Sequence, residues 1–164
     1  MNARACEASR IDAQGDQTMT AMNPHPTPAR QTRPRAALVS RDPATASRQA
    51  EVLRAAGYDV ETCGGPQQEA CPVIGGLPCP IVDRADVLIY DAWVAGSADA
   101  GRQLVAELRE TYADLPLVLT SVDESLAWVE TEGPLRVTSL TGDPSPEALV
   151  AAVTAALADQ GMAV

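Results

Sequence analysis

The sequence predicts an α/β fold in which helices cover both faces of a parallel β-sheet. Two observations lead to this prediction: short apolar segments of strand length recur along the chain, and segments of helical periodicity separate them. Parallel strands need such crossover connections, and right-handed crossovers place helices on both sides of a sheet. We therefore expect a doubly wound parallel sheet of five strands.

The first predicted strand and helix lie close to the start of the regular pattern. The run 36–40, "AALVS", is apolar and bounded by charge, which indicates a buried strand. Asp42 is a candidate N-cap with Pro43 at the first helical position, and the helix ends at Gly57. Residues 58–63, "YDVETC", alternate in polarity and predict the second strand.

The remaining three strands are more apolar. Segment 85–93 contains the unbroken run "VLIY", which is typical of a central strand buried on both faces. Segments 115–123 and 135–140 predict the fourth and fifth strands. Helical segments are predicted around them: 100–114 with Leu104, Val105 and Leu108 on one stripe, 123–133, and a last helix with Ser145 as N-cap and Pro146 at its first position.

The charge of the chain is unevenly distributed. Residues 1–35 hold five Arg and three acidic residues, whereas residues 36–164 hold seven Arg and nineteen acidic residues, a net charge of −12. Such a surface repels phosphates, so we expect no binding to nucleic acid. All twelve basic residues are Arg, which excludes any mechanism that needs a lysine amine.

Composition predicts two parts and a cytoplasmic location. Residues 1–34 are polar and rich in Pro, Thr and Gln, which indicates a disordered arm, and 35–160 form the expected domain. The chain lacks an apolar run long enough to span a membrane and lacks the apolar stretch of a signal peptide, so we expect no membrane partner. Thiols stay reduced in the cytoplasm, which argues against structural disulfides.

Three of the four cysteines are evenly spaced between the second and third predicted strands. Cys63, Cys71 and Cys79 follow one another at intervals of eight, among Pro and Gly residues that exclude a long helix. Three interpretations remain open. The thiolates could bind Zn²⁺ or an iron–sulfur cluster, although a fourth ligand must then come from elsewhere; they could form a disulfide or thiol switch; or they could pack as small apolar groups in an ordered loop.

Polar residues follow the predicted strands at their carboxyl ends, where doubly wound sheets gather functional groups. These residues are Ser40, Arg41 and Asp42 after the first strand, Asp91 after the third, Thr120 and Ser121 after the fourth, and Thr141, Gly142 and Asp143 after the fifth. We expect them to border one pocket.

Four segments carry a resemblance to a known family. In chain order they are "ALVSRDPATASRQAEVLRAAGYDV", "ADVLIYDAWVAG", "LPLVLTS" and "SLTGDPSPEAL". Their order and spacing resemble the receiver domain of bacterial two-component response regulators over roughly residues 35–160. The resemblance implies the flavodoxin-like strand order 2-1-3-4-5, with the Cys/Pro/Gly-rich segment in place of the second helix.

The resemblance also implies a phosphorelay chemistry, in which an aspartate accepts a phosphoryl group with the help of Mg²⁺ and a lysine. Asp91 matches the phosphoacceptor, and the backbone carbonyl of Trp93 matches a metal ligand. Ser121, or Thr120 with a one-residue shift, matches the switch hydroxyl.

The sequence departs from this family at the other pocket positions. Ser40 and Arg41 stand where the family has two acidic residues, with Asp42 one place further on, and Gly142 stands where it has lysine. A lone carboxylate binds Mg²⁺ poorly, so we expect weak or absent Mg²⁺ binding and slow or absent phosphorylation. Arg41 could form a charge-assisted hydrogen bond with Asp91; alternatively, Asp91 caps the following loop and Arg41 is solvated.

These observations predict a non-catalytic signalling or protein-interaction module, a pseudo-receiver independent of phosphorylation. The expected partners are proteins, and a second copy of the chain, in a homodimer, is one candidate. One alternative is a cysteine-based metal, iron–sulfur or redox sensor on the same scaffold, and another is an ordinary receiver that is phosphorylated on Asp91. An enzyme is not expected, because no nucleophile and base lie together at the predicted strand ends.

Overall fold

A five-stranded parallel sheet forms the centre of the protein. The computed structural model describes residues 33–66, 71–121 and 137–159, and its strands lie in the order β2-β1-β3-β4-β5. The strands are β1 (Arg35–Val39), β2 (Asp59–Cys63), β3 (Val87–Asp91), β4 (Leu117–Ser121) and β5 (Val137–Thr141). The predicted fold class and strand order are therefore confirmed.

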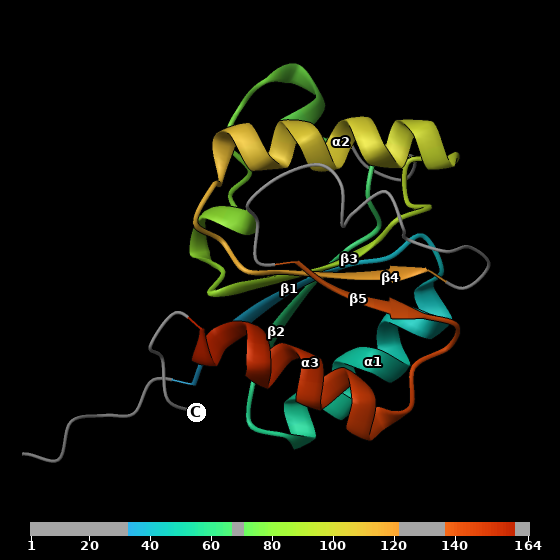
Figure 1. The fold of residues 1–164 in the computed structure, drawn as a ribbon, viewed down its shortest axis with the longest axis vertical. Coiled ribbons are helices and arrows are strands. Elements are labelled where there is room, and N and C mark those ends of the chain that lie inside the picture. The colour runs from blue at the N-terminus through green and yellow to red at the C-terminus, as the bar shows by residue number, and fades with distance from the viewer. Residues whose placement is uncertain (1–32, 67–70, 122–136, 160–164) are drawn as a thin grey trace, which may run out of the picture. The chain divides into compact units, whose positions relative to one another are not determined.

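Helices cover both faces of the sheet. They are α1 (Pro43–Ala55), α2 (Ala98–Thr111) and α3 (Pro146–Ala158). Figure 1 shows α1 and α3 on one face and α2 on the other. The side chains of Asp42, Ser97 and Ser145 each accept hydrogen bonds from backbone N–H groups in the first turn of these helices. Asp42 and Ser145 are thus the N-caps that the sequence predicts.

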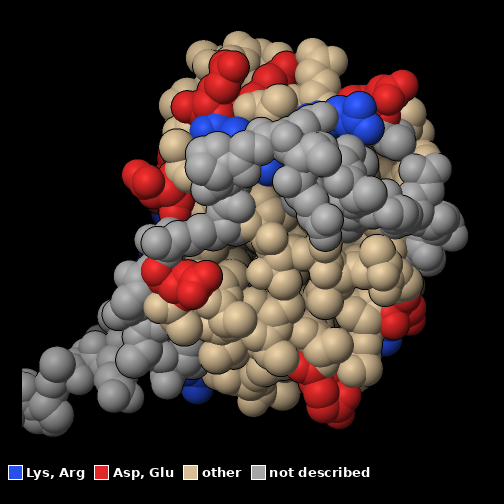
Figure 2. Space-filling view, in the orientation of Figure 1, with Lys and Arg blue, Asp and Glu red and all other residues tan. Residues whose placement is uncertain are grey.

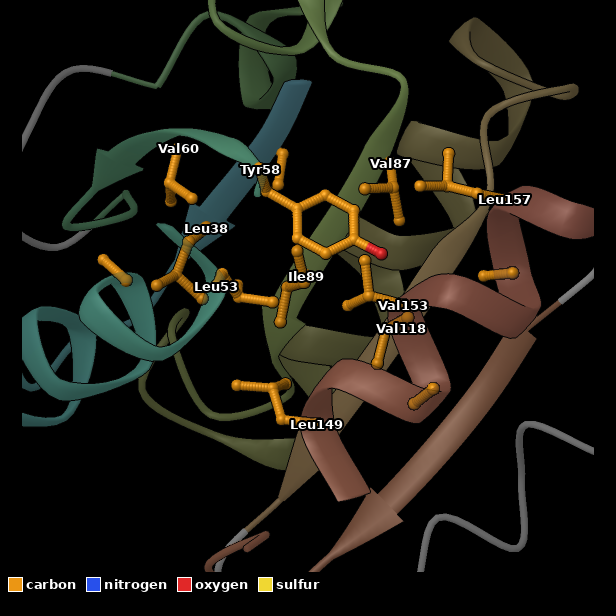
Figure 3. Close-up of a cluster of buried hydrophobic side chains, with 14 residues drawn as sticks. Leu38, Leu53, Tyr58, Val60, Val87, Ile89, Val118, Leu149, Val153 and Leu157 are labelled. Carbon is orange, nitrogen blue, oxygen red and sulfur yellow. The ribbon is translucent and has the colours of Figure 1, made fainter. Parts of the chain in front are cut away.

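The face covered by α1 and α3 holds one of two hydrophobic clusters. Figure 3 shows Leu53 of α1 and Val153 of α3 directed at Ile89 of the central strand, and all three side chains are 0% exposed. The Tyr58 ring fills the space between the helices, and its hydroxyl forms a 2.8 Å hydrogen bond with the Thr154 hydroxyl. This cluster joins both helices to the sheet.

The opposite face is covered by α2 and by the cysteine-containing segment 71–84. The predicted stripe Leu104, Val105 and Leu108 is buried on the inner side of α2. The segment has no long helix; it has two short 3₁₀ turns, η1 (Val73–Gly75) and η2 (Val82–Arg84). Its buried anchors are Val73 and Val82, so the segment packs as part of the core.

A tyrosine at the end of α2 holds this segment in place. The Tyr112 hydroxyl accepts a 2.6 Å hydrogen bond from the backbone N–H of Cys79 and donates a 2.7 Å bond to Asp83. Two residues of the segment are therefore fixed to one side chain of the helix.

Predicted element boundaries differ from the observed ones by up to three residues. One difference affects the predicted pocket: Asp91 is the last residue of β3, whereas the sequence analysis placed it after that strand. The predicted helix 123–133 and nearly all of the predicted arm 1–34 lie outside the described residues.

Candidate functional site

A pocket of about 270 Å³ lies at the carboxyl ends of the central strands. Its walls include the predicted pocket residues Ser40, Arg41, Asp42, Asp91, Trp93, Thr120, Gly142 and Asp143, whereas Ser121 and Thr141 do not line it. The topology explains this convergence. β1 and β4 flank β3, and the three strands are parallel, so their carboxyl ends lie at the same edge of the sheet.

Asp91 caps the loop that follows β3. Its Oδ1 accepts a 3.0 Å hydrogen bond from the backbone N–H of Trp93. The carbonyl of Trp93 in turn accepts a 2.8 Å bond from the backbone N–H of Gly96. The loop is therefore closed by its own hydrogen bonds. The Asp91 carboxylate, which matches the family's phosphoacceptor, takes part in them, and so does the Trp93 carbonyl, which matches a metal ligand.

The two candidate switch hydroxyls have different environments. Thr120 is the register partner of Asp91 in the sheet, lines the pocket and donates to the Tyr90 carbonyl at 3.5 Å. Ser121 is 0% exposed, and its hydroxyl accepts a 3.3 Å hydrogen bond from the indole N–H of Trp93. Of the two, Thr120 is the one whose position faces Asp91.

Asp42 directs its carboxylate to the first turn of α1. Oδ1 accepts from the Ala44 N–H at 3.3 Å and Oδ2 from the Thr45 N–H at 3.1 Å, and the Thr45 hydroxyl also donates to Oδ2. The Ser40 hydroxyl binds the backbone of Asp42, accepting from its N–H at 3.3 Å. Both side chains thus stabilise the turn between β1 and α1.

This cap makes stability depend on pH. The hydrogen bond from the Thr45 hydroxyl, followed by those from the backbone of Thr45 and Ala44, lowers the pKa of Asp42 below its ordinary value. A lowered pKa in the folded state stabilises the fold above the ordinary Asp pKa of about 4, and this contribution is lost as pH falls through the folded-state pKa. We expect Asp42→Asn, which caps without titrating, to flatten the pH dependence of urea unfolding between about pH 2 and 5. Equal pH profiles for both proteins would contradict this assignment.

One arginine lines the pocket, and a second is paired with an acidic residue of its rim. Arg41 is exposed and lines it, and whether it bonds Asp91 stays a prediction. Arg48 of α1 pairs with Asp143 at 3.3 Å, and both side chains are more than half exposed (55% and 65%), so the pair contributes about 0–1 kcal/mol. Asp143 is thereby held at the pocket rim.

The sequence analysis did not identify Gln49 or Arg48 at this site. Gln49 is buried and lines the pocket from α1, where it shares the inner face with Ala46 and Leu53. Helical periodicity could have identified it. The partner of Arg48 lies 95 residues away, and no local pattern indicates that pair.

Gly142 occupies the position that matches the family's lysine. Its φ is +80°, a left-handed backbone conformation that residues other than glycine adopt only at an energetic cost. Its backbone N–H donates a 2.8 Å hydrogen bond to the Ser121 carbonyl. The turn after β5 is therefore built for glycine.

The three cysteines border a second, much smaller cavity on the α2 face. Cys63, Cys71 and Cys79 are reduced, half-buried and line a space of about 40 Å³. Within residues 33–66, 71–121 and 137–159, no three Cys, His, Asp or Glu side chains converge in a geometry suited to a metal ion. Metal binding by these cysteines stays a prediction.

The surface carries acidic side chains on several sides. Figure 2 shows Asp and Glu distributed around the edge of one face, with fewer Arg among them. In the part of the chain that the structure describes, no helix has both the length and the apolar character that crossing a membrane requires.

Comparisons with known proteins identify the fold. Neither a family model nor a curated protein matches the chain. Among solved structures, a CheY-like response regulator receiver domain protein from Methanospirillum hungatei aligns with a TM-score of 0.63 and 14% identity, over 79% of this chain and 98% of that one. The chain has the receiver fold.

Two further solved structures illustrate the range of the likeness. A response regulator receiver domain protein from Clostridium thermocellum aligns with a TM-score of 0.62 at 14% identity, over 78% of this chain and 97% of that one. A putative pilus assembly protein from Burkholderia thailandensis aligns with a TM-score of 0.56 at 21% identity, over 76% and 98%. Identities this low establish the shared fold but not a shared activity.

Proposed function

We propose that this chain is a receiver-fold signalling module that acts through a protein partner without phosphorylation of Asp91. One observation carries the proposal: the only acid near the position of the family's acidic pair, Asp42, uses both carboxylate oxygens to cap α1. A receiver that accepts a phosphoryl group needs such carboxylates for Mg²⁺.

The residues of the pocket do not fit Mg²⁺. This ion requires near-octahedral oxygen ligation, commonly with one or two carboxylates. Here Asp91 shares one oxygen with the Trp93 N–H, the Trp93 carbonyl accepts from Gly96, and Arg41 brings a positive charge to the pocket where the family has an acid. That charge opposes a divalent cation.

The cation that would meet phosphoryl oxygens is missing from its family position as well. Gly142 stands there in a left-handed conformation, and the sequence contains no lysine. Arg48, an arginine of α1, is paired with Asp143. These features support a pocket whose state does not change by phosphoryl transfer.

Acetyl phosphate with Mg²⁺ tests this proposal. We expect intact-mass analysis of the full chain to find no acyl phosphate, and Trp fluorescence to report Mg²⁺ binding only weakly. Arg41→Asp should raise Mg²⁺ affinity at least tenfold, because it adds a carboxylate and removes a cation, whereas the neutral control Arg41→Asn should raise it less. Phosphorylation that Asp91→Asn abolishes would overturn the proposal.

A protein partner is supported by exposed apolar side chains on segment 71–84. Ile74 is 56% and Leu77 61% exposed, and they are the large hydrophobic residues that the described surface leaves most open to solvent. The acidic charge of the chain disfavours nucleic acid as the partner. Sedimentation of the full chain would test whether that partner is a second copy in a homodimer.

A second candidate function, cysteine-based sensing, is favoured by one observation. Three cysteines at intervals of eight converge on a single cavity, and two of them, Cys71 and Cys79, lie in the segment 71–84 that presents Ile74 and Leu77. Chemistry at the thiols would therefore act on the segment that carries the exposed apolar residues.

A further inference from the structure

The pocket at the carboxyl ends of the strands is lined by a buried polar side chain that lacks a partner. Gln49 reaches the pocket from α1 and is only 7% exposed. Within residues 33–66, 71–121 and 137–159, its side-chain amide forms no hydrogen bond, yet the amide is not sealed off from solvent. A buried amide without partners costs free energy, so this position favours a ligand that bonds with it.

Asp91 provides a second acceptor in the same pocket. Its Oδ1 accepts the hydrogen bond from the Trp93 N–H, whereas its Oδ2 has no hydrogen-bond partner in the part of the chain that the structure describes. The side chain is half-buried and lines the pocket. A carboxylate oxygen in such a place binds charged N–H donors more strongly than neutral ones.

The charges of the pocket walls favour a cation over an anion. Three acidic side chains line the pocket, those of Asp42, Asp91 and Asp143, together with one basic side chain, that of Arg41. Asp143 is paired with Arg48, and both oxygens of Asp42 cap α1, which leaves Asp91 as the acid with an open oxygen. An organic cation differs from Mg²⁺ because it binds through N–H donors and needs no octahedral set of oxygen ligands.

A guanidinium group matches these acceptors in shape and size. It is planar and has five N–H donors, so it can donate to the Asp91 carboxylate and to the Gln49 amide oxygen at the same time. Trp93 also lines the pocket, and guanidinium groups are attracted to the faces of aromatic rings. The volume of about 270 Å³ corresponds to about nine water molecules at roughly 30 Å³ each, which leaves room for the group and part of the chain that carries it.

We propose that this pocket binds a guanidinium group, with Asp91 Oδ2 and the Gln49 amide oxygen as its acceptors and the Trp93 ring beside it. The group belongs either to a small molecule such as free arginine or to an arginine side chain of a partner protein, and the chemistry of recognition is the same. This inference deepens the proposed signalling function and rests on it, because a phosphoryl group on Asp91 would occupy the same oxygen. A bound guanidinium changes the charge of the pocket without phosphoryl transfer.

Calorimetric titration of the full chain with L-arginine tests the proposal. L-Citrulline, which has nearly the same shape but a neutral ureido group, should bind at least tenfold more weakly. Asp91→Asn should lower the affinity for L-arginine at least tenfold, although the asparagine oxygen can still accept from the Trp93 N–H. Gln49→Leu, which keeps the volume of the side chain, should lower it at least threefold with an unchanged circular dichroism spectrum.

Asp59→Asn provides the matched control for charge. Asp59 begins β2 at the opposite edge of the sheet, and its replacement removes the same charge as Asp91→Asn. We expect the affinity for L-arginine to stay the same in this variant. An equal loss of affinity in Asp59→Asn and Asp91→Asn would overturn the proposal, and so would L-citrulline or L-lysine binding as tightly as L-arginine.

A blocked peptide, acetyl-Gly-Arg-Gly-amide, distinguishes the two sources of the group. Tighter binding of the peptide than of L-arginine identifies a protein side chain as the ligand, and tighter binding of L-arginine identifies a small molecule. If neither binds, the proposed site is wrong.

Failure of this site can be told apart from failure of the proposed function. If no guanidinium compound binds and acetyl phosphate leaves Asp91 unmodified, the site fails and phosphorylation-independent signalling stands. If acetyl phosphate modifies Asp91, that function fails, and the affinity of the unphosphorylated chain for L-arginine still decides whether the site exists.

Discussion

Replacing Gly101 by alanine is expected to lower the free energy of unfolding by about 3 kcal/mol. Gly101 is buried inside α2, and a Cβ at this position would overlap the backbone carbonyl oxygen of Ala92. Backbone atoms cannot rotate away as a flexible side chain can, so the helix or the loop after β3 must shift. Helix propensity alone predicts the opposite sign, a gain of about 1 kcal/mol for alanine.

Gly75→Ala provides the matched control for this prediction. Gly75 ends η1, and a Cβ there meets nothing within 4 Å. Urea unfolding should therefore place Gly75→Ala within about 1 kcal/mol of the unmodified chain and Gly101→Ala far below it. Similar stabilities for the two variants would show that α2 does not rest on the Ala92 carbonyl.

The contact between Gly101 and Ala92 also bears on the candidate site. Ala92 follows Asp91 directly, within the loop that the Asp91 carboxylate caps. A shift of α2 away from Ala92 would move this loop. Gly101→Ala should therefore change the near-ultraviolet signal of Trp93 along with stability.

Much of the fold could be predicted because local patterns determine it. The run "VLIY" in β3 is buried on both faces, as its unbroken apolar character predicts, with each of the four residues at most 3% exposed. Asp42 and Ser145 cap helices because a short polar side chain before Pro fixes the first helical turn. These signals lie within four residues of the feature that they predict.

Contacts between distant residues set the details that the sequence left open. Strand order predicted that Asp91 and Thr120 share a pocket, but the bond from Trp93 to Ser121 depends on side-chain directions that no periodicity specifies. The convergence of the cysteines is similar. Their spacing of eight residues matched no known motif, and only the packing of segment 71–84 against α2 brings them to one cavity.

Replacing Leu53 by alanine is expected to lower the free energy of unfolding by about 3 kcal/mol. Leu53 is 0% exposed and contributes to the cluster that joins α1 and α3 to the central strands. Figure 3 shows its side chain directed into that cluster beside Leu38 and Ile89. Truncation removes buried methyl groups and leaves a cavity, and both losses lower stability.

Leu77→Ala removes the same atoms from a side chain that is 61% exposed. Because most of that surface already contacts water, urea unfolding should find a change within about 0.5 kcal/mol. Comparing the two variants thus distinguishes a residue that stabilises the fold from one that binds a partner. A loss of partner binding in Leu77→Ala at unchanged stability would assign segment 71–84 to the interface. A loss of stability in Leu77→Ala as large as that in Leu53→Ala would instead mean that the Leu77 side chain itself belongs to the core, and the protein partner would have to bind elsewhere.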